Sequence, residues 1–344
     1  MKMNNCDKKI IFKITLLLTL FYLLVQIYLE NFSFDWNHQP SIEQKEFYKI
    51  ERYGSLAPSN VTVISQYFYL EKSKHSYREY KEWLTNFFTS VSSPLVIFTD
   101  RNFIIQDLIK IRIGFDYPTT LYITDSIWNL MSENEIKRNR NYKSNYKRRQ
   151  LKLDREKKIH NPDLYAVWNL KSFIVDKLAQ ENLYNSTAFV YSDSGAWRQQ
   201  VLERWPDQSQ VLNLIDRLNE KILLGQLCDV KECPDGKKRN FPDFDIIEGT
   251  FFMGSKKALN YFKEEFWSIH DEKLDKGEFV GKDQIIMNIF AFHNKTSSNS
   301  IKLDIWRRKC NITFDNPWNF YQNYLAWDYP CANNRESLLS INRI

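Results

Sequence analysis

Short apolar blocks alternate with amphipathic segments along most of the chain, and this alternation predicts strands and helices in turn. The strand-like blocks are 61–69, 95–100, 119–123 and 188–193. Segments 77–90 and 164–179 carry apolar residues at helical spacing. Short strands separated by helices are typical of an α/β fold. We therefore predict one α/β domain with a central, mostly parallel sheet flanked by helices.

Two of the predicted strands end in a carboxylate. Asp100 closes one block and Asp193 closes another. Open α/β sheets bind their ligands outside the carboxyl ends of the strands. Both acids are therefore candidates for a binding site.

The first thirty residues follow a different pattern. Residues 10–29 form an apolar stretch that is long enough to span a bilayer. Lysines precede this stretch and acids follow it, so the positive-inside rule places the N-terminus in the cytosol. We predict a cytosolic tail at 1–9, a transmembrane signal anchor at 10–29, a stem at 30–55 and a lumenal domain at 56–344. An oddly cleaved secretory signal would change the tethering but not the compartment.

Cysteines and glycosylation sequons fit a lumenal domain. Sequons begin at Asn31, Asn60, Asn185, Asn294 and Asn311. The four cysteines beyond the predicted anchor are an even number. We expect the disulfides Cys228–Cys233 and Cys310–Cys331, which is one of three connectivities. Four free thiols are the alternative, and the spacing disfavours a zinc site.

Composition and charge argue against several classes of ligand. The chain has 9 glycines in 344 residues and contains neither G-x-G-x-x-G nor G-x-x-x-x-G-K-[ST], so a glycine cradle for a dinucleotide or phosphate is not expected. Residues 137–158 are strongly basic. They predict either a flank for an anionic substrate or a solvated helix or loop. A lumenal domain is not expected to bind nucleic acid.

The first block with candidate chemistry joins an apolar strand to Asp193, Gly195 and Arg198. Nucleotide-sugar transferases place an Asp-x-Asp, or a shortened version of it, at such a strand end. The carboxylate there holds a divalent cation, Mn²⁺ or Mg²⁺, on the donor diphosphate. Asp193 is thus the candidate metal ligand, and Gly195 permits close backbone approach. The alternative is an ordinary Asp-Ser-Gly turn.

A second block contains Gly249 and Gly254, which bracket an aromatic strand. In a chain with few glycines, this placement indicates either close approach of a ligand or a bulged strand.

A third block places Gly281 just before Asp283 and Gln284, which open an amphipathic helix. A carboxylate and an amide are suited to bind sugar or acceptor hydroxyls. The alternative is that Asp283 only caps the helix.

These blocks, in this order, resemble the HtrL/YibB-like family of glycosyltransferases. The blocks are VIFTD (96–100), YAVWNLKSFIV (165–175), FVYSDSGAWR (189–198), IEGTFFMGS (247–255) and GEFVGKDQIIMN (277–288). The resemblance covers about residues 61–292. It implies a GT-A-like fold in one compact domain and a nucleotide-sugar donor.

The resemblance carries over residue by residue through three motifs: Asp-x-Gly, Trp-Asn-x-Lys and Gly-Lys-Asp-Gln. The matching positions are Asp193, Gly195, Trp168, Asn169, Lys171, Gly281, Lys282, Asp283 and Gln284. The chain departs from the pattern at Thr250 and Met253, where small residues are expected. It also lacks the second Asp of a full Asp-x-Asp motif.

Together these features predict a type II, membrane-anchored glycosyltransferase of the Golgi or endoplasmic reticulum, acting on a glycan, protein or lipid acceptor. The expected donor-binding residues are Asp100, Lys171, Asp193, Gly195 and Arg198. The expected acceptor-binding residues are Gly249, Gly254 and Gly281, with Asp283 and Gln284 as catalytic residues. The alternative is a non-catalytic lumenal protein that binds glycans or acts as a scaffold on a degenerate transferase fold.

Overall fold

The computed structural model describes residues 48–100, 103–138, 140, 142, 145–198, 201–227, 242–243, 245–292, 303–307, 318–326 and 336–337. The predicted anchor at 10–29, all the cysteines and the sequons at Asn31, Asn294 and Asn311 lie outside these residues. Among the helices in these ranges, none has both the length and the apolar character needed to cross a bilayer.

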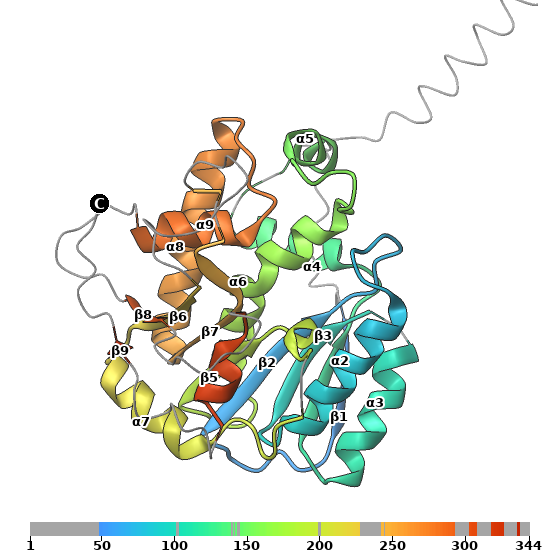
Figure 1. Ribbon diagram of the computed structural model, residues 1–344, viewed down its shortest axis with the longest axis vertical. Coiled ribbons are helices and arrows are strands. Elements are labelled where there is room, and N and C mark those ends of the chain that lie inside the picture. The colour runs from blue at the N-terminus through green and yellow to red at the C-terminus, as the bar shows by residue number, and fades with distance from the viewer. Residues whose placement is uncertain are drawn as a thin grey trace, which may run out of the picture. The chain divides into compact units, whose positions relative to one another are not determined.

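A mixed sheet forms the centre of the domain, with the strand order β1-β4-β3-β2-β5-β7-β6-β8-β9 (Figure 1). The strands are β1 (Lys49–Tyr53), β2 (Val61–Tyr67), β3 (Leu95–Thr99), β4 (Thr119–Ile123), β5 (Ala188–Ser192), β6 (Ile222–Gln226), β7 (Ile247–Gly254), β8 (Leu303–Arg307) and β9 (Glu336–Ser337). Strands β2 to β6 and β8 share one direction, whereas β1, β7 and β9 run against their neighbours. The predicted α/β fold with a mostly parallel sheet is therefore confirmed.

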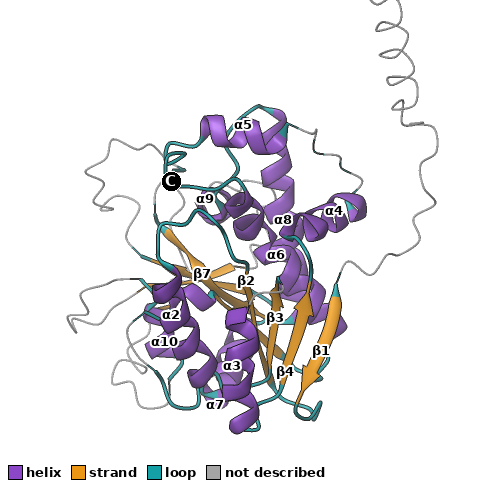
Figure 2. Cartoon of the chain, turned by 90° about the vertical axis from the view of Figure 1, so that its right-hand side faces the viewer, coloured by secondary structure: helices purple, strands orange, loops and turns teal. Residues whose placement is uncertain are grey.

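Helices cover both faces of this sheet (Figure 2). One face carries α2 (Tyr77–Ser90), α3 (Phe103–Gly114), α7 (Gln208–Leu218) and α10 (Phe320–Tyr324). The other carries α4 (Ile127–Lys137), α6 (Asp163–Glu181), α8 (Lys256–Asp275) and α9 (Asp283–Phe292). The short helix α5 (Tyr146–Leu153) packs beyond this second layer, and the 3-10 turn η1 (Ser194–Ala196) follows β5.

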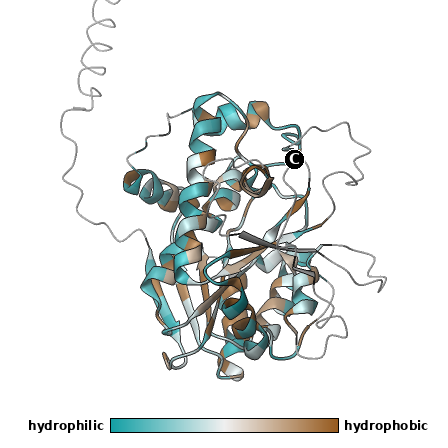
Figure 3. Ribbon diagram, turned by 90° about the vertical axis from the view of Figure 1, so that its left-hand side faces the viewer, coloured by the Kyte–Doolittle hydropathy of each residue, from teal (hydrophilic) through white to brown (hydrophobic). Residues whose placement is uncertain are grey.

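The core consists of two apolar clusters, one on each side of the sheet. Successive residues of a strand point to opposite faces, so Val63 joins the cluster under α2 while Ile64 joins the cluster under α6. Strands β2, β3 and β5 are buried along their whole length, as expected for strands covered on both faces. Figure 3 shows hydrophobic and hydrophilic residues mixed along the helices, which fits helices with one face on the sheet.

The domain begins earlier than the sequence pattern indicates. Residues Lys49–Tyr53 lie inside the predicted stem, yet they form β1 and pair with β4 along its full length. Polar and apolar residues alternate only weakly in this edge strand, so its sequence gives little signal.

Chain order reverses at the centre of the sheet. From β2 the chain moves outward through β3 and β4, and then returns to place β5 on the other side of β2. The carboxyl ends of β2 and β5 therefore flank a topological switch point, where open α/β sheets bind their ligands. The two described sequons, at Asn60 and Asn185, are exposed at the opposite, amino ends of these strands.

Candidate active site

The centre of the candidate site is a buried lysine between two acids. The Lys171 Nζ atom lies 2.8 Å from the Asp283 Oδ2 atom and 3.6 Å from the Asp193 Oδ2 atom. It also donates a hydrogen bond of 2.8 Å to the Gly249 carbonyl oxygen. Four positions predicted from separate sequence blocks thus meet around one ammonium group.

Helix α6 delivers this lysine to the carboxyl edge of the sheet. Residues three and four apart share a face of a helix, and Leu164, Trp168 and Lys171 all line the same pocket. The neighbouring residue Asn169 points elsewhere and donates a hydrogen bond of 2.8 Å to the Val280 carbonyl, which fixes the chain just before α9.

The position of Asp193 follows from the end of β5. Its Oδ1 atom accepts a hydrogen bond of 3.0 Å from the Gly195 backbone and so caps η1. Its backbone N–H binds the Thr250 carbonyl on β7. The second carboxylate oxygen is left to face Lys171, and 29% of the side chain is exposed. Asp193 therefore forms an Asp-Ser-Gly turn, and its side chain also faces the pocket.

Gly249 allows β7 to pass close to the start of α9. A Cβ atom there would lie 3.1 Å from the Asp283 Oδ2 atom and 3.1 Å from the Gln284 Cγ atom. Gln284 in turn donates a hydrogen bond of 2.8 Å to the Ile247 carbonyl. The close approach that the sequence indicates at Gly249 is thus to the protein's own carboxylate.

Burial and charge oppose each other in this cluster. Burial raises the pKa of Asp283, while Lys171 acts to lower it. Burial acts to lower the pKa of Lys171, but Asp283 and Asp193 outweigh it, so that the pKa of Lys171 is raised. The lysine is therefore held as a cation between the two acids.

A pocket of about 480 Å³ opens above the cluster. Its lining includes five cations, Lys72, Lys74, Lys171, Arg198 and Lys282, and four carboxylates, Glu156, Asp193, Asp245 and Asp283. A second pocket of about 290 Å³ shares Tyr80, Trp168 and Asp193 with the first. The combined space is large enough for a small polar ligand with an aromatic or sugar ring.

Arg198 lies at the edge of this pocket. Its guanidinium group stacks on the Trp83 ring at 4.4 Å, and its Nε atom donates a hydrogen bond of 3.1 Å to the Gly195 carbonyl. The side chain is thus positioned by the turn that follows Asp193.

Three predicted residues lie apart from the cluster. Asp100 lines a different pocket and accepts a hydrogen bond from the Tyr69 backbone. Gly254 lies at the far end of β7 from Gly249, and a Cβ atom there would meet Ala258 at 3.0 Å. Gly281 packs so closely on Tyr165 that a Cβ atom would lie 2.7 Å from its ring. The structure accounts for both of these glycines by packing.

Two groups near the site were not singled out in the sequence. Glu248 is fully buried next to the cluster, and burial raises its pKa to about 7. His160 lines the larger pocket and lies 2.7 Å from the buried carboxylate of Asp154. A single acid in an aromatic strand and a lone histidine just after the basic segment are weak sequence signals. Only the folded contacts reveal these two groups.

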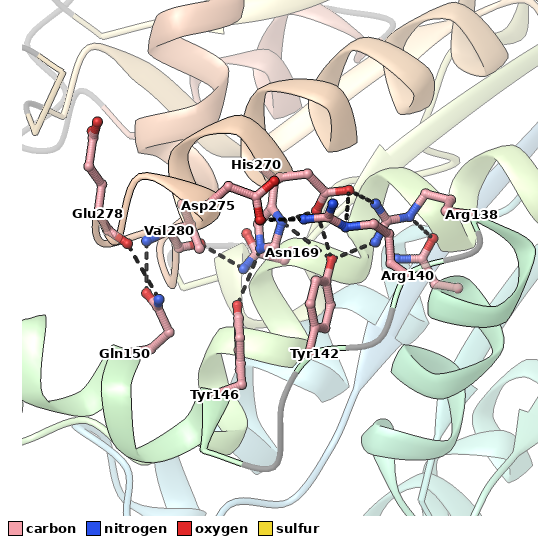
Figure 4. A network of polar contacts seen from close by, with 12 residues as sticks. Arg138, Arg140, Tyr142, Tyr146, Gln150, Asn169, His270, Asp275, Glu278 and Val280 are labelled. Atoms are coloured by element: carbon pink, nitrogen blue, oxygen red, sulfur yellow. Dashed lines mark hydrogen bonds and ion pairs between the residues drawn. The ribbon is translucent and has the colours of Figure 1, made fainter.

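Several residues of the basic segment 137–158 bind side chains of α8 (Figure 4). Arg138 and Arg140 form ion pairs with Asp271, and Arg140 also pairs with Asp275 at 2.8 Å. Tyr142 and Tyr146 point toward the buried His270, and each hydroxyl lies 3.3 Å from a ring nitrogen. Gln150 binds the Val280 backbone N–H at 2.8 Å.

The described residues do not fit the divalent cation predicted at Asp193. The ammonium group of Lys171 lies where such a cation would bridge Asp193 and Asp283. The other oxygens of these two acids accept backbone hydrogen bonds from Gly195 and Gln284. Within the described ranges, no group of three or more His, Cys, Asp or Glu side chains could hold a metal ion.

With this geometry in place, the chain can be compared with known proteins. Its sequence matches no protein-family model, and a search of curated proteins finds no significant relative.

Proposed function

We propose that this protein is a glycosyltransferase with a GT-A-like domain that uses a nucleotide-sugar donor. The observation that carries the proposal is the bridge of Lys171 between Asp193 and Asp283, in a pocket at the switch point of the sheet. The predicted signal anchor adds that the enzyme is a type II protein of the Golgi or endoplasmic reticulum, with this pocket in the lumen.

The cations of the pocket are suited to a departing diphosphate. A glycosyl transfer leaves negative charge on the phosphate oxygens as the sugar departs, and fixed positive groups stabilise that charge. Lys171 is fixed by three contacts, and Arg198 is fixed by Trp83 and the Gly195 carbonyl. Because neither group must reorganise, both can act without a metal ion.

Aromatic side chains supply a second part of the site. Tyr80 and Trp168 line both pockets beside Asp193. Rings of this kind suit the flat faces of sugars and nucleobases. The smaller pocket therefore fits one ring of the donor, while the larger pocket fits its diphosphate and the acceptor.

Binding and turnover test this proposal. The full-length protein would be titrated with UDP, GDP and CMP by calorimetry, with and without EDTA, and screened for hydrolysis of the matching nucleotide sugars. We expect one nucleotide to bind with an affinity that EDTA changes less than twofold, and its sugar donor to be hydrolysed. Failure of all three nucleotides to bind would contradict the proposal.

The same pocket supports one alternative, a glycan-binding or scaffold protein. Each acid of the central cluster already has a partner, which is compatible with a site that binds without reacting. Binding of an oligosaccharide with neither nucleotide binding nor donor hydrolysis would favour this alternative.

A further inference from the structure

His160 lies in the loop between α5 and α6, where a buried carboxylate orients its ring. The His160 Nδ1 atom is 2.7 Å from the Asp154 Oδ2 atom, and only 4% of the Asp154 side chain is exposed. The same carboxylate accepts hydrogen bonds from the Tyr165 hydroxyl at 2.7 Å and from the Glu156 backbone at 2.8 Å. Asp154 is thus fixed, and it fixes the imidazole in turn.

His160 lines the larger pocket, where Glu156 is the neighbour of its other ring nitrogen. The His160 ring packs edge-on against Trp168, with centroids 5.1 Å apart, and 11% of the side chain is exposed. Its Nε2 atom lies 4.0 Å from the Glu156 Oε2 atom. Among the described residues, the titratable groups in contact with His160 are Asp154 and Glu156, and Tyr165 contacts Asp154.

His160 and the ammonium group of Lys171 belong to the same pocket. Trp168 precedes Lys171 by three residues on α6, which corresponds to roughly one helical turn, about 5 Å along the axis. His160 packs against Trp168, and all three side chains line the larger pocket. A ligand that fills this pocket therefore lies near both the imidazole of His160 and the charge of Lys171.

Asp283 is poorly placed to accept a proton from an acceptor. Its side chain is 4% exposed, one oxygen pairs with Lys171, and the other binds the Gln284 backbone. A general base must lie within hydrogen-bond reach of the proton that it removes. The structure therefore favours a structural and electrostatic role for Asp283.

We infer that the Asp154–His160 pair is the general base of the transfer reaction, with Asp154 as its positioning residue. This inference rests on the proposed function. The Nε2 atom of His160 removes the proton of the attacking hydroxyl as its oxygen bonds to the anomeric carbon. The bond from that carbon to the phosphate oxygen breaks, and its electron pair leaves with the nucleoside diphosphate. A single base-assisted displacement of this kind inverts the anomeric centre.

The test uses the full-length protein in mild detergent and a panel of UDP-glucose, UDP-galactose, UDP-N-acetylglucosamine and GDP-mannose. For the donor that is hydrolysed fastest, kcat is measured against pH for the wild type, His160→Gln, Asp154→Asn and His75→Gln. His75 is the matched comparison, because it lines the same pocket but faces the exposed Glu79 at 3.4 Å instead of a buried acid.

For the wild type, we expect kcat to rise with pH as the base loses its proton, and the sugar product to be inverted. His160→Gln should lower kcat about a hundredfold or more and remove the rise with pH. It should change the affinity for the nucleoside diphosphate less than threefold. Asp154→Asn should lower kcat about tenfold, and His75→Gln should keep the rise with pH.

Three results would overturn the inference. They are a pH profile that His160→Gln leaves unchanged, a loss of nucleotide affinity as large as the loss of kcat, and a retained anomeric configuration. In each of these cases donor hydrolysis by the wild type still supports the proposed function. If no donor is hydrolysed, the proposed function fails and the general base fails with it.

Discussion

Replacement of Lys171 by methionine tests the central charge cluster directly. Methionine keeps most of the length and volume of the side chain and removes only the ammonium group. Asp283, with 4% of its side chain exposed, then loses its closest cation. Breaking a buried ion pair by removing one partner costs about 3 to 5 kcal/mol, because the remaining charge is uncompensated. We expect Lys171→Met to lower the free energy of unfolding by about 4 kcal/mol.

Helix α6 supplies a matched control in Lys177. This lysine also lies between two acids, at 3.3 Å from Glu133 and 3.1 Å from Glu181, but Glu181 is 32% exposed. Water can solvate Glu181 when the cation is removed, and Glu133, which is 12% exposed, keeps Lys137 at 2.9 Å, so Lys177→Met should cost only about 1 kcal/mol. The double variant Lys171→Met with Asp283→Asn should regain part of the loss, because it removes both charges.

Urea unfolding, followed by tryptophan fluorescence, measures these differences. The penalty of Lys171→Met should also depend on pH. Without its lysine, Asp283 has a pKa raised further by burial, and a carboxyl with a raised pKa in the folded state stabilises the fold at low pH and loses that contribution as pH rises. The gap between the variant and the wild type should therefore narrow as pH falls from 7 toward 5. Equal penalties for both lysine variants, with no dependence on pH, would refute the reasoning.

Three further predictions follow from single contacts. Asp193→Asn still caps η1, so we expect an unchanged melting temperature and roughly a hundredfold lower turnover; unchanged turnover would remove Asp193 from the site. Gly249→Ala places a methyl group 3.1 Å from Asp283 and should cost about 1 to 3 kcal/mol in urea unfolding, whereas Gly114→Ala, with open space around its Cα, should be neutral or stabilising. Burial raises the pKa of Glu248 to about 7, so this group favours the fold at low pH and loses that contribution as pH rises to 7. Glu248→Gln should therefore flatten the dependence of the free energy of unfolding on pH between about 4.5 and 7. An unchanged dependence would show that the pKa of Glu248 is not raised by burial.

The sequence predicts much of the fold because its strongest patterns are local. The helix expected at 77–90 has those bounds in the structure, where Ser76 and Glu79 form a capping box at its start. Strand directions are a different matter. Nothing in the aromatic run of β7 shows that it runs against β5 and β6, since direction is set by contacts between distant segments.

The candidate site is predicted only in part, for the same reason. Asp193 could be found because a carboxylate at the end of a buried strand has a position fixed by the strand. Gly281 is predicted to bind the acceptor, but it packs against the rings of Phe279 and Tyr165, and no spacing in the sequence indicates the contact with Tyr165. His160 stands out only through its contacts with Asp154 and Trp168, and these contacts form only when the chain has folded.

The bridge at Lys171 also has a consequence for how this sequence can evolve. Its buried pair, Lys171 and Asp283, comes from α6 and α9, and each of the two is tolerable only while the other is present. A step that costs about 3 to 5 kcal/mol uses a large share of the roughly 5 to 15 kcal/mol that keeps a domain folded. Single replacements of Lys171 or Asp283 should therefore be purged, and homologous chains should inherit these two residues as a pair. A homologous chain that has lost Lys171 is expected to have lost Asp283 as well, or to have gained a metal ion between Asp193 and Asp283.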